Sequence, residues 1–393
     1  MTPSAFAGMV ADAYPSFRLH HLHPGVCKHA VVRPELLELV ARSNRLFTIE
    51  DAGTSLEGRT ISLVRMGTGS RRILLWSQMH GDEPTATLAL LDILNGMLTW
   101  HTEGWFTGML HDVSIVIVPM LNPDGAERRQ RCNAAGIDVN RDAAARSSPE
   151  ADILRRVHGQ FRPDFGLNLH DQQLRSVGAL PVPSALALLA PPPSADLKTT
   201  GTRLRAIRLA ALLARVLGPY ADGYITRYED SFEPRAFGDT FQAAGTSTVL
   251  IESGHRKQDP EKAFSRKLNV IGILTALRSI SNGSYDDTEL DHYHRLPPNG
   301  RWMFDILFRG VELHHPGGWH HIVDVGVDFQ KDHATVVIKE IGDLRTHGGL
   351  EVIDLARRPI STDLLRVDAV IPTKELFDAL QTYANYPPIA FRP

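Results

Sequence analysis

The residues best suited to chemistry are a histidine and a glutamate three positions apart, His80 and Glu83. They follow a run of apolar residues at 73–76, and the pattern predicts a strand over 72–79 and a helix over 84–98. Both side chains would then stand at the carboxyl end of a strand, where open α/β sheets bind ligands. An imidazole and a carboxylate at this spacing can together hold one Zn²⁺ ion.

A second histidine, His170, ends another short apolar strand predicted over 165–170. With His80 and Glu83 it would complete a set of two histidines and one glutamate, which leaves a fourth zinc position for water, as in catalytic sites. A metal held in this way activates the water and polarises a carbonyl group. An isolated histidine at a strand end is more often only hydrogen-bonded, so the prediction depends on the three ligands ending neighbouring strands.

Two further segments carry polar side chains that could act on a substrate. The loop after the next predicted strand contains Arg131, Asn140 and Arg141, and the planar guanidinium of arginine matches a carboxylate in shape. A solvated loop with surface arginines is the alternative interpretation. Glu252 directly follows the predominantly apolar run 248–251. Partial desolvation would raise its pKa and suit a general base, whereas a helix-capping or salt-bridged glutamate is the simpler alternative.

The composition is that of a globular soluble protein. Of the 393 residues, 43% are hydrophobic and 22% are charged, and a net charge of −3 provides no basic surface for nucleic acid. Cys27 and Cys132 are too few for a disulfide framework. The first residues lack a basic stretch followed by an apolar core, and no apolar run reaches the roughly 18 residues of a membrane span. We therefore expect a cytoplasmic protein that binds neither membrane nor nucleic acid, with its oligomeric state left open.

Strands and helices alternate along most of the chain. Residues 1–45 are predicted as a helical lead-in, and the glycine-rich segment 66–70 is predicted as a hairpin turn between two strands. Over 46–282 the alternation predicts an α/β domain, with a mixed, mostly parallel sheet between helices. A polar linker follows over 283–299, and short alternating strands over 300–393 predict a small C-terminal β-rich domain.

The ordered set of motifs between about residues 45 and 280 resembles the M14 family of zinc carboxypeptidases. The matching segments are Gly-Thr-Ser-Leu-Glu-Gly-Arg at 53–59, His-Gly-Asp-Glu at 80–83, Asn-Pro-Asp-Gly at 122–125 and Gly-Ile-Asp-Val-Asn-Arg at 136–141. A histidine at a strand end and a late glutamate complete the set. The resemblance implies the zinc carboxypeptidase fold for this part of the chain.

The resemblance also implies one zinc ion per chain, bound by His80, Glu83 and His170. Asp138 matches the carboxylate that orients the first zinc histidine through a hydrogen bond.

For the substrate, the resemblance implies that Glu252 acts as general base and then as proton donor. Arg131 looks like the arginine that stabilises the oxyanion formed at the substrate carbonyl. Asn140 and Arg141 match the pair that grips a terminal carboxylate.

Three departures from the family pattern concern the substrate. Digestive carboxypeptidases carry an arginine before the ligand glutamate, whereas this chain has Asp82, which is closer to bacterial members acting on cell-wall peptides and to small-molecule deacylases of the same superfamily. The family's mobile tyrosine has no assigned match, although Tyr224 and Tyr228 lie in the corresponding region. Arg235 either lines the specificity pocket, where it would favour an acidic substrate group, or lies on the surface.

The C-terminal segment resembles the small β-sandwich beside amidohydrolase barrels, over 304–311, 324–327, 341–344 and 352–354. No barrel and no His-x-His metal motif follows, so we assign this module no catalysis. Four histidines of the module suggest a second metal site, but exposed loop residues are the preferred interpretation; they are His314, His315, His320 and His321.

The predicted function is zinc-dependent hydrolysis of an amide or peptide bond next to a free C-terminal carboxylate, by a metallocarboxypeptidase in which Glu252 and the metal activate water. The substrate would be a peptide or an N-acyl amino acid. The first alternative is an N-acyl amino acid deacylase or a cell-wall peptide amidase that uses the same metal site. The alternative of another class is a non-catalytic protein that holds zinc. The presence of Glu252 and Arg131 argues against it, because binding alone needs neither.

Overall fold

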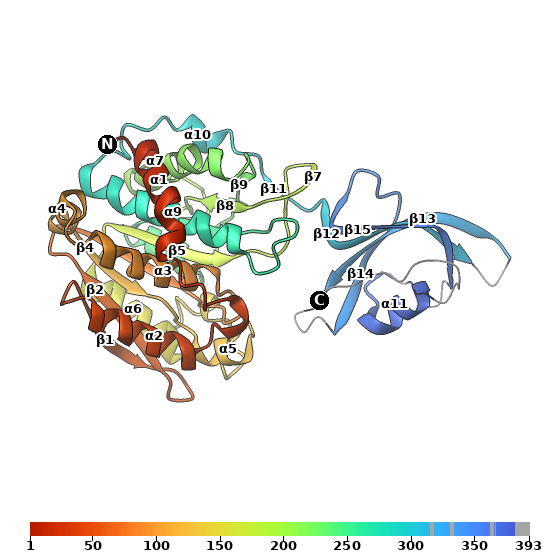
Figure 1. Cartoon of the computed structure of the whole chain (residues 1–393), viewed down its shortest axis with the longest axis horizontal. Helices are drawn as coiled ribbons and strands as arrows, with labels where there is room; N and C mark the ends of the chain where they lie inside the picture. Colours follow the sequence, from red (N-terminus) through yellow and green to blue (C-terminus); the bar gives the residue numbers. More distant parts are fainter. Residues whose placement is uncertain (315–317, 331–333, 362–364, 366, 382–393) are drawn as a thin grey trace. The chain divides into compact units, whose positions relative to one another are not determined.

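The chain forms two compact units, which are considered separately (Figure 1). The computed structural model describes residues 1–314, 318–330, 334–361, 365 and 367–381. The larger unit consists of 1–173, 185–255 and 259–299. The smaller unit consists of 174–184, 256–258 and the segment from residue 300 onward.

The larger unit is built on a mixed sheet of eight strands. The parallel strands β4, β3, β5 and β10 form its centre, β1, β2 and β4 pair antiparallel on one side, and β8 pairs antiparallel with β10 on the other. The predicted mixed sheet between helices is confirmed. Across the sheet the strands are β1 (Phe47–Thr54), β2 (Thr60–Met66), β4 (Val113–Val118), β3 (Arg71–Ser77), β5 (Phe165–Asp171), β10 (Ser247–Ser253), β8 (Leu186–Leu189) and β9 (Ile225–Arg227).

Helices cover both faces of this sheet (Figure 1). A hydrophobic core lies on each face. Successive side chains of a strand point to opposite faces, so Ile73 and Leu75 of β3 belong to one core while Leu74 and Trp76 belong to the other. The first core is covered by α1 (Pro3–Phe17), α2 (His29–Arg42), α3 (Thr85–Trp100), α4 (Gly104–Asp112), α7 (Gly201–Leu217) and α9 (Ala263–Asn282). The second is covered by α6 (Pro149–Phe161) and α8 (Phe237–Ala243).

Local sequence signals explain where the helices begin. At the start of α6 the Ser148 hydroxyl accepts a hydrogen bond from the Ala151 N–H group, and Pro149 occupies the first helical position. Within the part of the chain that the structure describes, no helix is both long and apolar enough to span a membrane. The short elements of the larger unit are α5 (Pro123–Arg128), α10 (Asp291–His294) and the 3₁₀ turns η1 (Pro24–Val26), η2 (Val139–Arg141) and η3 (Gly218–Tyr220).

The carboxyl ends of β3, β5 and β10 meet at one edge of the sheet, because the three strands are parallel neighbours. His170 of β5 lies directly beside Glu252 of β10 in the strand register. The turn that follows β3 carries His80 and Glu83. The topology therefore brings together side chains that are far apart in the sequence.

The hairpin predicted at 66–70 is wrong. β2 and β3 flank this segment, but β4 lies between them in the sheet, and β2 forms its hairpin with β1 instead. The segment passes the start of β4, where the Gly69 N–H group donates to the Val113 carbonyl oxygen at 3.1 Å. A Cβ atom on Gly69 would lie 1.9 Å from the carbonyl carbon of Asp112. Glycine is therefore needed here for close backbone approach, which a turn signal in the sequence does not distinguish from a hairpin.

A buried ion pair joins the N-terminal segment to the core of the larger unit. Arg266 of α9 is 2% exposed, and its guanidinium donates to both carboxylate oxygens of Asp92 on α3, at 2.6 and 2.7 Å. The same carboxylate accepts hydrogen bonds from the Tyr14 hydroxyl at 3.0 Å and the Leu19 N–H group at 2.8 Å. Arg266 also donates to the carbonyl oxygens of Leu19 and Leu22. The predicted lead-in is therefore packed into the larger unit through α1 and the segment that follows it.

The smaller unit contains a five-stranded sheet whose core includes Ile306 and Phe308. The predicted C-terminal β-rich region is confirmed, whereas its resemblance to an amidohydrolase sandwich and the domain boundaries stay predictions. The order across the sheet is β15 (Gly348–Ser361), β12 (Met303–His314), β13 (His320–Phe329), β14 (Thr335–Gly342) and β16 (Val370–Pro372), and α11 (Thr373–Gln381) follows. A second, three-stranded sheet consists of β11 (Asn299–Gly300), β6 (Ser176–Val177) and β7 (Leu180–Pro183).

Replacing Arg266 by methionine should destabilise the protein by about 3–5 kcal/mol, because it leaves the Asp92 carboxylate buried without its cation. Urea unfolding followed by circular dichroism measures this change. Arg295→Met is the matched control, since the Arg295 side chain is 82% exposed and pairs with Asp291 on the surface; its effect should stay within about 0.5 kcal/mol. Equal stability of the two variants would contradict the structural role of the buried pair.

Candidate metal centre

The structure brings the three predicted metal ligands together. His80 and Glu83 lie in the turn between β3 and α3, and His170 is the penultimate residue of β5. One ligand atom from each residue lies within 4.8 Å of the other two, and the three residues are 3%, 8% and 3% exposed, respectively. Among the described residues, this is the one group of His, Cys, Asp and Glu side chains with a geometry that could hold a metal.

The Glu83 carboxylate lies between the two imidazoles. Its Oε1 is 2.7 Å from His80 Nδ1, and its Oε2 is 2.8 Å from His170 Nδ1. The backbone N–H group of Asp171 also donates to Oε2, at 3.1 Å. The Nδ1 atoms of both rings are therefore directed toward one carboxylate.

Neighbouring side chains hold the opposite edge of each ring. His80 Nε2 is 3.1 Å from Asp138 Oδ1, and His170 Nε2 is 3.3 Å from the side-chain nitrogen of Asn140. The Asn140 N–H group donates to the same Asp138 oxygen at 2.9 Å. Partners of this kind fix ring orientation and so prepare the other nitrogen for a metal.

Arg131 borders the group from the solvent side, with 38% of its side chain exposed. Its Nε donates to Asp138 Oδ2 at 2.9 Å, and its Nη1 lies 3.2 Å from His80 Nδ1 and 3.5 Å from Glu83 Oε1. A guanidinium in this position faces any group that binds beside the three ligands.

The donor set fits zinc. Zinc prefers histidine nitrogen and carboxylate oxygen in tetrahedral geometry, and three protein ligands leave one position open in a catalytic site. Here two Nδ1 atoms and a carboxylate converge, they are buried, and both rings are held on their opposite edges. The assignment of these residues as the zinc ligands stays a prediction that this geometry supports.

Burial and neighbouring charges shift the pKa values of the group in different directions. Burial lowers the pKa of His170, although the Glu83 carboxylate opposes the shift. Burial also disfavours charge on His80, but the carboxylates of Glu83 and Asp138 outweigh it and raise the pKa of His80 to about 9. Despite burial, the two imidazoles hold the pKa of Glu83 well below its ordinary range. Glu83 is therefore an ionised carboxylate, which is the form that binds a metal.

Glu252 stands beside this group as a buried carboxyl that is 7% exposed. Burial, reinforced by the negative charge of Glu83, raises the pKa of Glu252 to about 8. Its Oε2 atom has no hydrogen-bond partner among the described residues. A desolvated carboxylate with an unused acceptor is suited to take a proton from a water molecule, although the role of Glu252 stays a prediction.

Asn140 and Arg141 lie on the 3₁₀ turn η2, close to the metal group. The Asn140 side-chain oxygen accepts a hydrogen bond from the Phe237 N–H group at 3.1 Å. Arg141 Nε lies 3.4 Å from Glu233 Oε2. Arg235 also pairs with Glu233, through bonds of 2.8 and 2.6 Å. The guanidinium predicted to bind a substrate carboxylate thus faces a carboxylate of the chain itself.

The sequence reasoning missed Glu233 and a second polar cluster behind the metal group. The Asp171 carboxylate accepts from the Thr85 hydroxyl at 2.6 Å and from Lys262 Nζ at 3.3 Å. Asp171 directly follows His170, so this cluster fixes the strand end that carries a predicted ligand. The adjacency of Asp171 to His170 was a visible signal, whereas Lys262 lies too far along the chain for spacing to reveal its contact.

Two glycines explain why the turn after β3 and the Asn-Pro-Asp-Gly segment occur together. A Cβ atom on Gly81 would lie 2.0 Å from the carbonyl carbon of Gly125, so the two backbones are in direct contact. The Asn122 side chain fastens the contact, since its nitrogen donates to the Met79 carbonyl oxygen at 3.1 Å and its oxygen accepts from the Gly125 N–H group at 2.9 Å. Both motifs therefore serve to place His80 and Glu83.

Other residues considered from the sequence lie elsewhere in the fold. Tyr224 and Tyr228 flank β9, which is two strands away from β10, so their assignment stays open. His314 and His320 are cross-strand partners in β12 and β13, where both approach Glu312, at 3.2 and 3.8 Å. His321 also lies in β13, and His315 lies outside the described residues.

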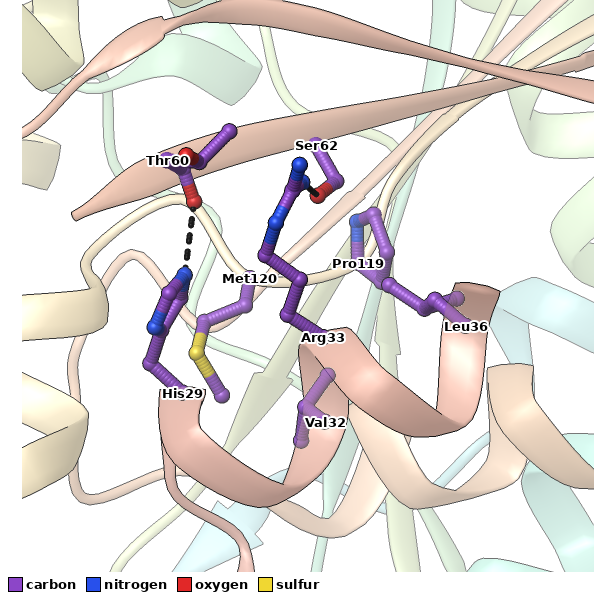
Figure 2. A pocket seen from close by; sticks show the side chains of 8 residues that line it. All are labelled: His29, Val32, Arg33, Leu36, Thr60, Ser62, Pro119 and Met120. Atoms are coloured by element: carbon purple, nitrogen blue, oxygen red, sulfur yellow. Dashed lines mark hydrogen bonds between the residues drawn. The ribbon is translucent and has the colours of Figure 1, made fainter. Parts of the chain in front are cut away.

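Figure 2 shows a pocket between α2 and β2 that is separate from the metal group. His29 Nε2 lies 3.0 Å from the Thr60 carbonyl oxygen, and Arg33 donates to the Ser62 hydroxyl at 2.7 Å (Figure 2). The volume of the pocket is about 10 Å³, which is room for roughly one water molecule. It is therefore too small for a substrate.

Comparisons with known proteins agree with the fold of the larger unit. Residues 34–162 match the family model described as zinc carboxypeptidase. Carboxypeptidase 2 of Trichophyton rubrum is 26% identical over 191 residues, which cover 42% of this chain and 35% of that protein. The match to this curated relative thus spans about a third of its length.

Two solved structures share the fold at low sequence identity. The metallo-carboxypeptidase from Burkholderia cenocepacia is 17% identical, with a TM-score of 0.50 over 64% of this chain and 68% of that one. Carboxypeptidase A from Helicoverpa armigera is 17% identical, with a TM-score of 0.51 over 65% of this chain and 74% of that one. The larger unit therefore has the fold of the metallo-carboxypeptidases. The match of residues 34–162 to the zinc carboxypeptidase model agrees with the predicted resemblance to family M14, and zinc is the metal of that family.

Replacing Asp138 by asparagine should weaken zinc binding by about 10- to 100-fold. The neutral amide no longer provides the negative charge that the carboxylate places beside His80 and Arg131. Competition with a chromogenic chelator gives the zinc dissociation constant, and circular dichroism checks the fold. Asp51→Asn is the control, since its carboxylate is 61% exposed and pairs with Arg33. An unchanged zinc affinity in Asp138→Asn would contradict the positioning role of Asp138.

Proposed function

We propose that this chain is a zinc-dependent hydrolase that cleaves an amide or peptide bond next to a free C-terminal carboxylate. The observation that carries the proposal is the position of Glu252, a buried carboxyl beside the group formed by His80, Glu83 and His170. A protein that only stores zinc needs no such base, and the non-catalytic alternative leaves Glu252 unexplained.

Glu252 is the group that moves the proton. Bound zinc would supply a Lewis acid that polarises the substrate carbonyl and makes water more acidic. The Glu252 carboxylate accepts the proton of the attacking water and delivers it to the nitrogen of the leaving amine. Burial raises the pKa of Glu252 to about 8, so that both the ionised carboxylate and the protonated carboxyl are populated near neutral pH.

Two arginines interact with different negative charges of the substrate. Arg131 Nη1 lies within 3.5 Å of ligand atoms of His80 and Glu83, where its N–H groups can stabilise charge that develops on the carbonyl oxygen. Arg141, held on the same loop, provides a guanidinium for the free carboxylate of the substrate. This second contact places the bond to be cleaved at a fixed distance from Glu252.

A peptide is the first substrate class, and an N-acyl amino acid is the second, since both carry an amide next to a carboxylate. The curated relative matches over about a third of its length, so the substrate belongs to the proposal. Hydrolysis of N-blocked dipeptides, a cell-wall tripeptide and N-acyl amino acids, with and without chelator, would rank these classes. The expected cytoplasmic location stays a prediction.

Replacing Glu252 by glutamine should lower kcat by about 10²- to 10⁴-fold while one zinc ion per chain remains bound, because glutamine is nearly isosteric but cannot accept the proton. Initial rates and zinc content of the same preparation provide the two measurements. Glu229→Gln, at an exposed position, is the control for loss of one negative charge. Retention of most of the activity in zinc-loaded Glu252→Gln would remove Glu252 from the proposed role.

Replacing Arg141 by alanine should raise KM strongly and lower kcat less, because the contact to the carboxylate exists in both the ground state and the transition state. A charge-assisted hydrogen bond contributes about 1.5–3 kcal/mol, so amidating the C-terminus of the substrate should reduce wild-type kcat/KM by at least about tenfold. The amidated substrate should be almost indifferent to Arg141→Ala. Equal wild-type hydrolysis of free-acid and amidated substrates would indicate an endopeptidase or an amidase instead.

A further inference from the structure

The guanidinium of Arg141 is already approached by a carboxylate that belongs to the chain. Glu233 Oε2 lies 3.4 Å from Arg141 Nε. The same carboxylate receives two shorter hydrogen bonds from Arg235, at 2.8 and 2.6 Å. Glu233 therefore stands between two arginines, one with a proposed substrate role and one that is 60% exposed.

The backbone keeps this carboxylate in place. The Glu233 N–H group donates to Asp239 Oδ1 at 3.1 Å, and the Arg235 carbonyl oxygen accepts from the Ala143 N–H group at 3.1 Å. Arg141 in turn donates to the Asn140 carbonyl oxygen at 3.0 Å. Glu233 and Arg141 are thus both held by hydrogen bonds within and between the segments 140–143 and 233–239.

The two ion pairs of Glu233 differ in geometry. The contact to Arg235 involves both carboxylate oxygens, whereas the contact to Arg141 is single and longer. Hydrogen bonding to Arg235 lowers the pKa of Glu233 to about 2, and the charge of Arg141 contributes less. Glu233 is therefore ionised at every pH at which an assay would be run, and Arg235 is its principal partner.

We propose that Glu233 is a specificity-determining residue, which competes with the substrate carboxylate for Arg141 and is retained by Arg235 when the substrate binds. The inference rests on the proposed function, because it assumes that Arg141 receives a carboxylate. Glu233 then sets how much a free carboxylate on the ligand contributes to the binding affinity. A ligand with no group for Arg141 does not displace Glu233 and is unaffected by it.

This arrangement gives Arg235 an indirect role. By holding both oxygens of Glu233, Arg235 draws the carboxylate away from Arg141 and leaves that guanidinium available. Loss of Arg235 should therefore weaken binding of a carboxylate ligand, because Glu233 then pairs with Arg141 alone. If Arg235 instead contacted the ligand directly, its loss would weaken binding whether or not Glu233 were present.

The test uses 3-phenylpropionate, a carboxylate without a hydrolysable bond, and 3-phenylpropionamide as its neutral counterpart. Dissociation constants come from ligand-observed NMR titration of the zinc-loaded full chain. The variants are Glu233→Gln, Arg235→Gln, the double variant of these two, and Arg141→Ala. Glu229→Gln is the matched control, because it removes the same charge as Glu233→Gln from an exposed position in the same loop.

A partly exposed ion pair of this kind changes affinity by about two- to fivefold. We expect Glu233→Gln to tighten binding of 3-phenylpropionate by that factor and Arg235→Gln to weaken it by a similar factor. In the Glu233→Gln background, the Arg235→Gln replacement should have almost no effect. Binding of 3-phenylpropionamide should be the same in all variants, and Glu229→Gln should match the wild type with both ligands.

Three outcomes overturn the inference and differ in their meaning. If the wild type prefers the carboxylate and Arg141→Ala abolishes that preference, but Glu233→Gln binds like the wild type, the inference fails while the proposed function stands. A full effect of Arg235→Gln in the Glu233→Gln background likewise overturns the inference alone. If the wild type binds the two ligands equally and Arg141→Ala changes nothing, the carboxylate role of Arg141 fails, and the inference fails with it.

Discussion

The Glu83 carboxylate, held between two imidazole nitrogens, is the interaction on which the rest of the site depends. A charge that is removed from water needs close partners of opposite character, and Glu83 is only 8% exposed. Its partners come from the turn after β3 and from the end of β5, so the two strands must be parallel neighbours with matched ends. Acidic and basic groups then alternate outward, from Glu83 to His80, to Asp138 and to Arg131.

The scaffold meets this requirement through packing and one buried ion pair. Alternate side chains of the central strands enter separate cores on the two faces of the sheet, which fixes the orientation of each strand about its own axis. Asp92 and Arg266 link α3 to α9 and hold the segment after α1. Because α3 begins two residues after Glu83, the same ion pair also restrains the element that follows the metal group.

Much of the fold could be predicted because its signals are local. Runs of β-branched and apolar residues identified the central strands, and their alternation with helices indicated the mixed sheet. The histidine and glutamate at strand ends identified the metal group, and the structure places His80, Glu83 and His170 together as expected. The ordered motifs implied separate roles for Asp138 and Arg131, and the structure shows in addition that their side chains are joined by a hydrogen bond of 2.9 Å.

What could not be predicted depends on contacts between distant segments. The glycines at 66–70 suggested a hairpin, but β4 enters between the flanking strands, and no local pattern reveals an intervening strand. Glu233 carries no motif of its own, and its importance comes only from the loop that brings Arg141 within 3.4 Å. Lys262 is likewise separated by 91 positions from the Asp171 carboxylate that it contacts.

The hairpin of β6 and β7 has a consequence for how the two units are connected. Residues 174–184, which contain both strands, belong to the smaller unit. In the sequence, however, they come between β5 and β8 of the larger unit. Inside the smaller unit, the Ser176 hydroxyl accepts from the Trp302 N–H group at 3.2 Å, and a Cβ atom on Gly300 would lie 1.9 Å from the Gly178 carbonyl oxygen. The smaller unit therefore does not consist of the C-terminal segment alone. A gene fusion that joined two finished domains end to end would not produce this path, because the chain passes between the two units at five junctions rather than one: 173/174, 184/185, 255/256, 258/259 and 299/300.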